Sequence, residues 1–252
     1  MSRDIARLPL HRVITEPAEP VLRRTVATLA ALLRIFTHQD WRARHKIPAT
    51  GGAVFVVNHI SNFDPLAYGH FLTWAGRWPR FLAKDEIFKT PLLGWVARQS
   101  GQIEVRRTPG EGRDAVEAAI RAVTAGQGVT IYPEGTITAD PLTWPMTGRS
   151  GAARIALETG CPVVPIGQWG AQEILPGKKL TWPRLWPRRT MRVLAGDPVP
   201  LDDLRARSLD DAVLDEATDR ILDAITTLVA ELRQESPPPG RWDLALGRRL
   251  LP

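Results

Sequence analysis

A histidine and an aspartate, His59 and Asp64, stand five residues apart just after a run of five apolar residues. A hydroxyl becomes a good nucleophile only when its proton is removed during attack, and histidine suits this task because its pKa lies near neutrality. A carboxylate on the other ring nitrogen fixes the tautomer and stabilises the imidazolium that forms. The spacing therefore predicts general-base catalysis at a hydroxyl. The alternative is that Asp64 caps a helix beginning at Pro65 and that His59 is an ordinary loop residue.

The elements that would position this pair read as one α/β domain. The apolar run 53–57 has the character of a strand buried on both faces, and a helix is predicted from Pro65, with Asp64 as its N-cap, to about Ala75. Further strands are predicted at 81–83, 102–105, 128–132, 162–166 and 191–194, and further helices at 113–125, 151–158 and 209–234. This alternation predicts a single α/β domain with a largely parallel central sheet flanked by helices. Polar residues at 58–64 and 133–136 follow two of the strands, at the edge where ligands bind in such sheets.

Four short stretches between residues 45 and 200 resemble, in the same order, the motifs of the glycerolipid acyltransferases. The first is His, four residues and Asp after Asn58, and the second is a Gly-x-Ile-x-x-x-Arg pattern that ends at Arg107. The third is Pro-Glu-Gly-Thr at 133–136, and the fourth is the apolar run with a proline at 163–166. The chain is similar to the 1-acyl-sn-glycerol-3-phosphate (lysophosphatidate) acyltransferases of that family.

The resemblance implies a reaction and roles for residues. A fatty acyl group would pass from a thioester, acyl-CoA or acyl carrier protein, to a hydroxyl of lysophosphatidate, with His59 as base and Asp64 orienting it. The acceptor would be bound by Asn58, Lys84, Arg107, Glu134, Gly135 and Thr136. Because a carboxylate repels phosphate, we expect Glu134 to hold a hydroxyl or an arginine. The alternative interpretation is that Arg107 is an ordinary surface residue and that residues 133–136 only form a turn at the end of a strand.

One residue departs from the third motif. Ile137 stands where the family has an arginine, so one expected phosphate ligand is missing. Arg149, just before a predicted helix, is a candidate replacement. Other acceptors, such as glycerol 3-phosphate or a phosphoinositide glycolipid, stay open alternatives.

Positive charge is concentrated at the start of the chain. Residues 1–46 carry nine Lys or Arg against four Asp or Glu, whereas residues 201–252 carry seven against eleven. An apolar stripe at helical spacing follows Pro20 and is flanked by arginines; its members are Leu22, Val26, Leu29, Leu33 and Phe36. Such a helix either lies in a membrane interface rich in anionic lipid or packs on the core, and the flanking arginines favour the membrane.

We therefore divide the chain into a basic N-terminal segment with a membrane-interface helix (1–46), an acyltransferase domain (47–236) and a Pro-containing C-terminal tail (237–252). No apolar run is long enough to span a bilayer, and Cys161 is the only cysteine. We expect a peripheral protein on the cytoplasmic face of the cell membrane. Metal-ligand spacings are absent, so no cofactor is expected besides the thioester cosubstrate.

Two other classes of function are weighed. Residues 110–115 fit a loose Gly-x-Gly-x-x-Ala pattern of NAD-binding oxidoreductases, but Pro109 and two further residues separate the first glycine from the preceding strand. A basic stretch with Trp182 and Trp186 suits either nucleic acid or a membrane interface. We favour the membrane and expect no nucleic-acid partner.

Overall fold

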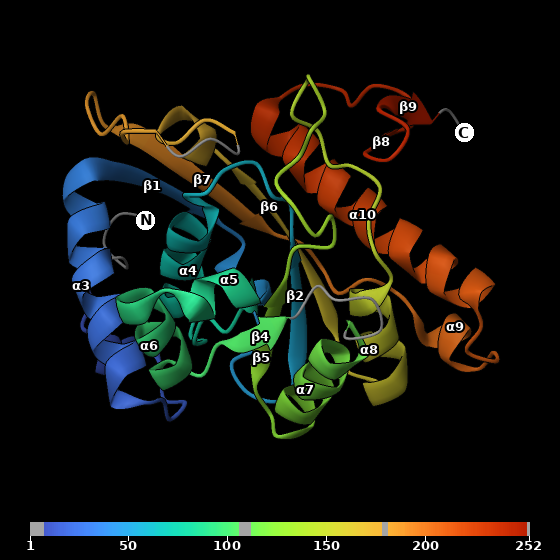
Figure 1. The fold of residues 1–252 in the computed structure, drawn as a ribbon, viewed down its shortest axis with the longest axis horizontal. Helices are drawn as coiled ribbons and strands as arrows, with labels where there is room; N and C mark the ends of the chain where they lie inside the picture. The colour runs from blue at the N-terminus through green and yellow to red at the C-terminus, as the bar shows by residue number, and fades with distance from the viewer. Residues whose placement is uncertain (1–7, 106–111, 178–180, 251–252) are drawn as a thin grey trace.

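The computed structural model describes residues 8–105, 112–177 and 181–250. A five-stranded sheet with the order β1-β7-β6-β2-β5 lies at its centre (Figure 1). Its strands are β1 (Thr37–Arg42), β2 (Ala53–Val57), β5 (Gly128–Ile131), β6 (Val163–Trp169) and β7 (Arg189–Ala195). The pairs β1–β7, β2–β5 and β2–β6 are parallel, and β6–β7 is antiparallel. The predicted largely parallel sheet is confirmed.

Strand β2 is completely buried because helices cover both faces of the sheet. Alternate residues of a strand point to opposite faces. Val54 and Val56 join a core cluster with α7 (Gly112–Thr124), α8 (Gly151–Thr159) and α10 (Asp211–Arg233). Ala53, Phe55 and Val57 join a second cluster with α3 (Pro20–Phe36) and α4 (Asp64–Trp74). The strand therefore leaves the core at a fixed point, and His59 follows it.

Smaller elements complete the domain. A two-stranded parallel sheet of β3 (Leu82–Lys84) and β4 (Ile103–Val105) meets β5 through a bridge between Phe81 and Thr130. The short helices are α2 (Leu10–Val13), α5 (Asp85–Lys89), α6 (Pro91–Gln99), α9 (Asp202–Arg205) and the 3-10 turns η1 (Arg44–Lys46) and η2 (Ala171–Glu173). Near the C-terminus, β8 (Arg241–Asp243) and β9 (Arg248–Leu250) form an antiparallel hairpin. Among the described residues, no helix combines the length and apolarity that crossing a membrane would require.

The N-terminal segment is part of the same packed unit. Strand β1 was not predicted, since its sequence, Thr-His-Gln-Asp-Trp-Arg, has no apolar alternation, yet it pairs with β7 at the edge of the central sheet. Helix α3 begins at Pro20 as predicted, but Leu22, Val26 and Leu33 of its apolar stripe are buried in the protein. Phe36, the last member of the stripe, is exposed, so the stripe packs on the core only in part, and the membrane-interface helix stays a prediction.

Candidate active site

His59 and Asp64 lie side by side at the end of β2. The imidazole Nδ1 and the Asp64 Oδ2 are 2.8 Å apart. The side chain of Asp64 is fully buried, while that of His59 keeps 16% of its surface exposed. The pair is thus anchored on the inside and accessible at the imidazole.

The Asp64 carboxylate organises the whole turn. Its Oδ2 also accepts the backbone N–H groups of Ile60 at 2.6 Å and Ser61 at 2.9 Å. Burial raises the pKa of Asp64, and the hydrogen bonds from His59 and the two amides oppose that rise. The expectation that Asp64 caps the next helix is wrong: α4 starts at Asp64 itself, Phe63 is its N-cap, and the carboxylate reaches back to the turn.

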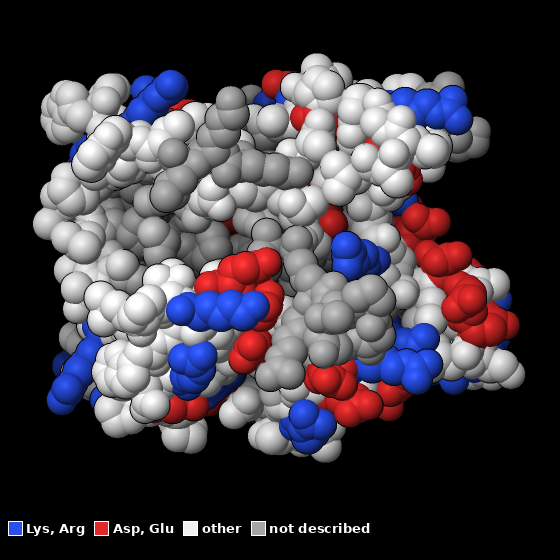
Figure 2. Space-filling model, in the orientation of Figure 1, with Lys and Arg blue, Asp and Glu red and all other residues white. Residues whose placement is uncertain are grey.

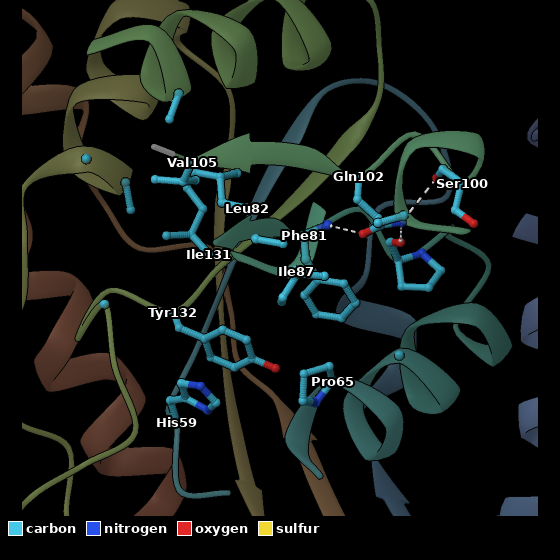
Figure 3. A pocket seen from close by; sticks show the side chains of 18 of the residues that line it. His59, Pro65, Phe81, Leu82, Ile87, Ser100, Gln102, Val105, Ile131 and Tyr132 are labelled. Carbon is cyan, nitrogen blue, oxygen red and sulfur yellow. Dashed lines mark hydrogen bonds between the residues drawn. The ribbon is translucent and has the colours of Figure 1, made fainter. Parts of the chain in front are cut away.

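Tyr132 covers one face of the imidazole. Its ring stacks on that of His59 with 4.2 Å between centroids and 18° between planes (Figure 3). Tyr132 follows β5, which is paired with β2 in parallel, so the two residues leave the sheet at the same edge. The contact was not predicted. Its one signal in the sequence was the position of Tyr132 directly before the Pro-Glu-Gly-Thr stretch.

Glu134 holds the main chain of His59. Its Oε1 accepts the backbone N–H of His59 at 2.8 Å, and its Oε2 accepts that of Met146 at 3.0 Å. The expectation of a hydroxyl or arginine partner is wrong, because backbone amides satisfy both oxygens. Burial raises the pKa of Glu134 to about 8, against the effect of these two hydrogen bonds. Since the N–H of Thr138 donates to the His59 carbonyl at 2.7 Å, the peptide groups on both sides of the histidine are held by the chain after β5.

That chain, residues 133–150, is in turn braced by the C-terminal hairpin. Asp140 is buried, accepts the N–H groups of Leu142 and Trp144, and binds the Arg249 guanidinium at 2.7 and 2.8 Å. The N–H of Thr147 donates to the carbonyl of Trp242 at 3.0 Å. The tail predicted at 237–252 therefore supports the loop that holds His59.

Asn58 joins the ends of β2 and β6. Its side-chain amide donates to the Gln168 carbonyl at 3.1 Å and accepts the Gln168 N–H at 2.8 Å. The Gln168 amide donates to the Asn58 carbonyl at 2.7 Å. Both residues are buried. The structure therefore contradicts direct substrate binding by the Asn58 side chain, which instead sets the place where the chain turns toward His59.

Gly135 and Arg149 lie together beside the pair. Gly135 has a φ of +66°, and a Cβ built on it would lie 3.2 Å from the Arg149 Nε. Both residues line the cavity described below, and Arg149 is exposed. Thr136 is half-buried and is absent from that lining, and Ile137 is buried in the core.

Three further predictions fall partly or wholly outside the described residues. Lys84 ends β3, its side chain being outside the description, and Arg107 lies outside the described residues altogether. The glycine pattern at 110–115 is described only from Gly112, the first residue of α7.

A cavity of about 1310 Å³ opens beside His59. His59 and Tyr132 stand at one end, with Pro65, Phe81 and Ile87 across from them (Figure 3). Its walls come from α3, α4, β3 and α6 and are mainly apolar; they include Leu22, Val26, Leu29, Leu33, Leu66, Leu82, Leu93 and Val96. Among the described residues, three arginines, Arg113, Arg149 and Arg154, and two glutamates, Glu117 and Glu158, also line it. The cavity offers a large apolar volume with a histidine and positive charge at its border.

Residues 39–169, just over half of the chain, match the Acyltransferase family. The chain belongs to this acyltransferase family. The predicted family is thereby confirmed. The match contains β2, the His59–Asp64 pair, the Pro-Glu-Gly-Thr stretch and the last four residues of β1.

Relatives of this acyltransferase carry names from lipid synthesis. It is 32% identical over 155 residues to the chloroplast 1-acyl-sn-glycerol-3-phosphate acyltransferase BAT2 of Brassica napus, covering 60% of this chain and 43% of the relative. It is 32% identical over 113 residues to the lyso-ornithine lipid O-acyltransferase of Pseudomonas aeruginosa, covering 45% and 41%. The matches thus span less than half of each relative's length.

A solved structure shares the fold. The 1-acyl-sn-glycerophosphate (LPA) acyltransferase PlsC from Thermotoga maritima superposes with a TM-score of 0.62 at 20% identity, covering 94% of this chain and 85% of that one. At this identity the likeness establishes the fold, and the predicted α/β class is confirmed.

Proposed function

We propose that this acyltransferase moves a fatty acyl group from a thioester donor, acyl-CoA or acyl carrier protein, to a hydroxyl of lysophosphatidate. The observation that carries the proposal is the 2.8 Å contact between His59 Nδ1 and Asp64 Oδ2 at the border of a large apolar cavity. An imidazole held in this way is suited to act on a hydroxyl at its free nitrogen.

The chemistry follows from the tautomer. With Nδ1–H donating a hydrogen bond to Asp64, Nε2 carries the lone pair and accepts the proton of the acceptor hydroxyl as its oxygen attacks the thioester carbonyl. A C–O bond forms, the C–S bond breaks, and the proton on Nε2 passes to the departing thiolate. Asp64 stabilises the imidazolium that exists between these transfers, since its carboxylate stays in contact with Nδ1.

The cavity accounts for the fatty acyl group. An apolar chain gains free energy in proportion to the apolar surface that it buries, at about 25 cal/mol per Å². The walls from α3, α4 and α6 supply leucine, valine and alanine side chains, whose surfaces are apolar. We assign the acyl chain to this cavity and the reacting carbonyl to its border beside His59.

Arg149 is the best candidate for the acceptor phosphate. It stands two positions before α8, where the helix N-terminus also favours an anion, and it lies against Gly135. Within the described residues its guanidinium has no hydrogen bond or ion pair, whereas Arg154 pairs with Glu158 at 3.3 Å. A guanidinium matches two phosphate oxygens at once. Lys84 and Arg107 are proposed as further ligands from the family pattern alone.

The location proposed is the cytoplasmic face of the cell membrane, where both the lipid acceptor and a soluble thioester are within reach. The chain would be peripheral there and would contact anionic lipid. No cofactor takes part in the proposed reaction.

The test is acyl transfer by purified protein, with lysophosphatidate and each thioester donor. We expect His59→Ala to lower kcat by roughly a hundred- to ten-thousandfold, the usual contribution of a general base. His45→Ala is the matched control, because His45 is exposed in η1 and should leave activity unchanged. Full activity of the His59→Ala protein would refute the proposal.

Two observations favour an acceptor other than lysophosphatidate as a second candidate. Ile137, in the place of the family's arginine, is buried in the core and cannot be a phosphate ligand. One relative is named for a lyso-ornithine lipid. The same assay with lyso-ornithine lipid, glycerol 3-phosphate and a lyso-form of a phosphoinositide glycolipid decides between acceptors, since the true one gives the highest kcat/KM.

A further inference from the structure

Two tryptophans on one short loop are almost completely exposed. Trp182 and Trp186, in the loop before β7, have 93% and 83% of their surface open to solvent. Tryptophan is large and mainly apolar, so exposing two of them so fully costs free energy unless another surface covers them. The acyl-transfer site does not use them: neither lines its cavity.

The loop is fixed in place against the end of α3. Between the tryptophans, Leu185 packs on a cluster that contains Leu33 of α3. The Arg188 guanidinium donates from Nη2 to the carbonyls of Arg34 at 2.7 Å and Thr37 at 2.6 Å. Trp186 is only two residues from Arg188, within about 7 Å along the chain. The loop that carries both tryptophans is therefore held beside the C-terminal turn of α3, at the upper left of Figure 1.

The outer face of that turn is apolar as well. Leu32 and Ile35 are 46% and 61% exposed, and Phe36 is exposed beside them. Leu32 and Ile35 lie on the side of α3 away from Leu22, Val26 and Ala30, which face the core, and Phe36 lies at the border between the two sides. These five residues, Leu32, Ile35, Phe36, Trp182 and Trp186, are called here the tryptophan face.

The charges around the tryptophan face are positive. Arg189 pairs with the neighbouring Glu173 at 3.5 Å. Besides it, the described residues from 174 to 196 include three further arginines and no Asp or Glu. One of them, Arg184, lies exposed between the two tryptophans. Acidic side chains gather instead at the opposite edge, over α9 and the adjoining part of α10 (Figure 2). A face that combines tryptophan, aliphatic side chains and arginine matches a bilayer surface with anionic headgroups, in which the rings enter the interface and the arginines meet phosphates.

We propose that the tryptophan face is the surface through which this protein docks on a lipid bilayer that contains anionic lipid. The purpose of this docking rests on the proposed function. Helix α3 carries part of the tryptophan face and also lines the apolar cavity, so docking would place the cavity next to the lipid that it receives. A nucleic acid is a poorer match, because Leu32 and Ile35 offer nothing to bases or phosphates. A second copy of the chain is also a poorer partner, because the arginines of one copy would be buried against the arginines of the other.

The test is flotation of the full chain with vesicles of phosphatidylcholine alone and of phosphatidylcholine mixed with phosphatidylglycerol. We expect wild type to float with the mixed vesicles. The double variant Trp182→Ser/Trp186→Ser should bind at least about tenfold more weakly, since two rings would no longer leave water. Leu209→Ser is the matched control, an exposed apolar residue beside the acidic edge, and should float like wild type.

Other outcomes overturn the inference. They are equal flotation of the double variant and wild type, loss of flotation by Leu209→Ser as well, stronger binding of the wild type to duplex DNA than to vesicles, or a dimer that the double substitution dissociates. Thermal unfolding of the double variant at the wild-type temperature shows that the fold is intact.

Acyl transfer to an acceptor dispersed below its micelle concentration is measured in parallel. Normal transfer with unchanged flotation refutes only the docking surface, and absent transfer with tryptophan-dependent flotation refutes only the proposed reaction.

Discussion

The carboxylate of Glu134 accepts the backbone N–H of His59 at 2.8 Å, across 75 residues of sequence. The Pro-Glu-Gly-Thr stretch therefore acts on the histidine through its main chain. The side chain of His59 receives two further supports, the hydrogen bond to Asp64 and the stacked ring of Tyr132. Glu134, on this geometry, is a positioning residue rather than a substrate ligand.

Replacing Glu134 with glutamine should damage both stability and turnover. Above about pH 8, where Glu134 has lost its proton, the new amide group would put a donor against the N–H of His59 or Met146 in place of a carboxylate oxygen. An unsatisfied buried hydrogen-bonding group costs about 1–3 kcal/mol. We expect kcat to fall while KM for the acceptor changes little, because the histidine moves and the binding groups do not. Steady-state kinetics and urea unfolding measure both effects. Asp215→Asn, at an exposed acid, is the control, and an unchanged kcat for Glu134→Gln would contradict the positioning role.

Stability should fall as pH rises, in part because of Glu134. The pKa of this group is raised from 4.5 to about 8, so between these values the folded chain keeps a proton that the unfolded chain has released. Its stabilising contribution is thus complete below pH 4.5 and lost as pH rises through about 8. One such proton gives a slope of at most about 1.4 kcal/mol per pH unit. Urea unfolding across this range should show a steeper decline for wild type than for Glu134→Gln, and parallel curves would argue against the raised pKa.

Asp64→Asn should nearly abolish turnover without preventing binding. Its Oδ2 accepts three N–H groups, so an amide oxygen in that place keeps contacts but loses the charge that stabilises the imidazolium. We expect kcat to fall roughly a thousandfold or more, by analogy with the loss of the aspartate charge in a catalytic triad. Kinetics with both substrates, together with thermal unfolding, separate catalysis from folding. A loss of kcat smaller than about tenfold would show that the carboxylate mainly shapes the turn.

Arg149→Ala should raise KM for a phosphorylated acceptor and leave KM for the thioester donor unchanged. A charged hydrogen bond contributes about 1.5–3 kcal/mol, which corresponds to an increase of about ten- to a hundredfold. Arg207→Ala is the control, since Arg207 is exposed and pairs with Glu216 on the surface. If KM for the acceptor stays at the wild-type value, Arg149 does not belong to the site.

Arg249→Met should loosen the loop that holds His59. Asp140 would remain buried with its two amide donors but without its cation, at a cost of about 2 kcal/mol in the free energy of unfolding. Turnover should fall as well, although Arg249 is in the C-terminal hairpin. Arg248→Met, the exposed neighbour, is the matched control. The double variant Asp140→Asn/Arg249→Met should regain part of the stability, and no regain would mean that the two residues act independently.

Local patterns predicted the parts of the structure that depend on neighbours in sequence. The apolar run of β2, the start of a helix within one residue of Pro65 and the approach of His59 to Asp64 are all set within a dozen residues. Contacts between distant residues left no such pattern. Asn58 and Gln168 are 110 residues apart, and the polar strand β1 becomes a strand only because β7 lies beside it. The amphipathic stripe of α3 was recognised, but periodicity alone does not tell a helix on a core from a helix on a lipid surface.

The bracing of residues 133–150 by the hairpin has a consequence for biosynthesis. Arg249 emerges from the ribosome 109 residues after Asp140, a delay on the order of 5–20 s at usual rates of translation. Until then the buried aspartate lacks its cation and Thr147 lacks the carbonyl of Trp242. A nascent chain therefore holds its histidine loosely, and enzymatic competence arrives as a late event, after the central sheet has been made.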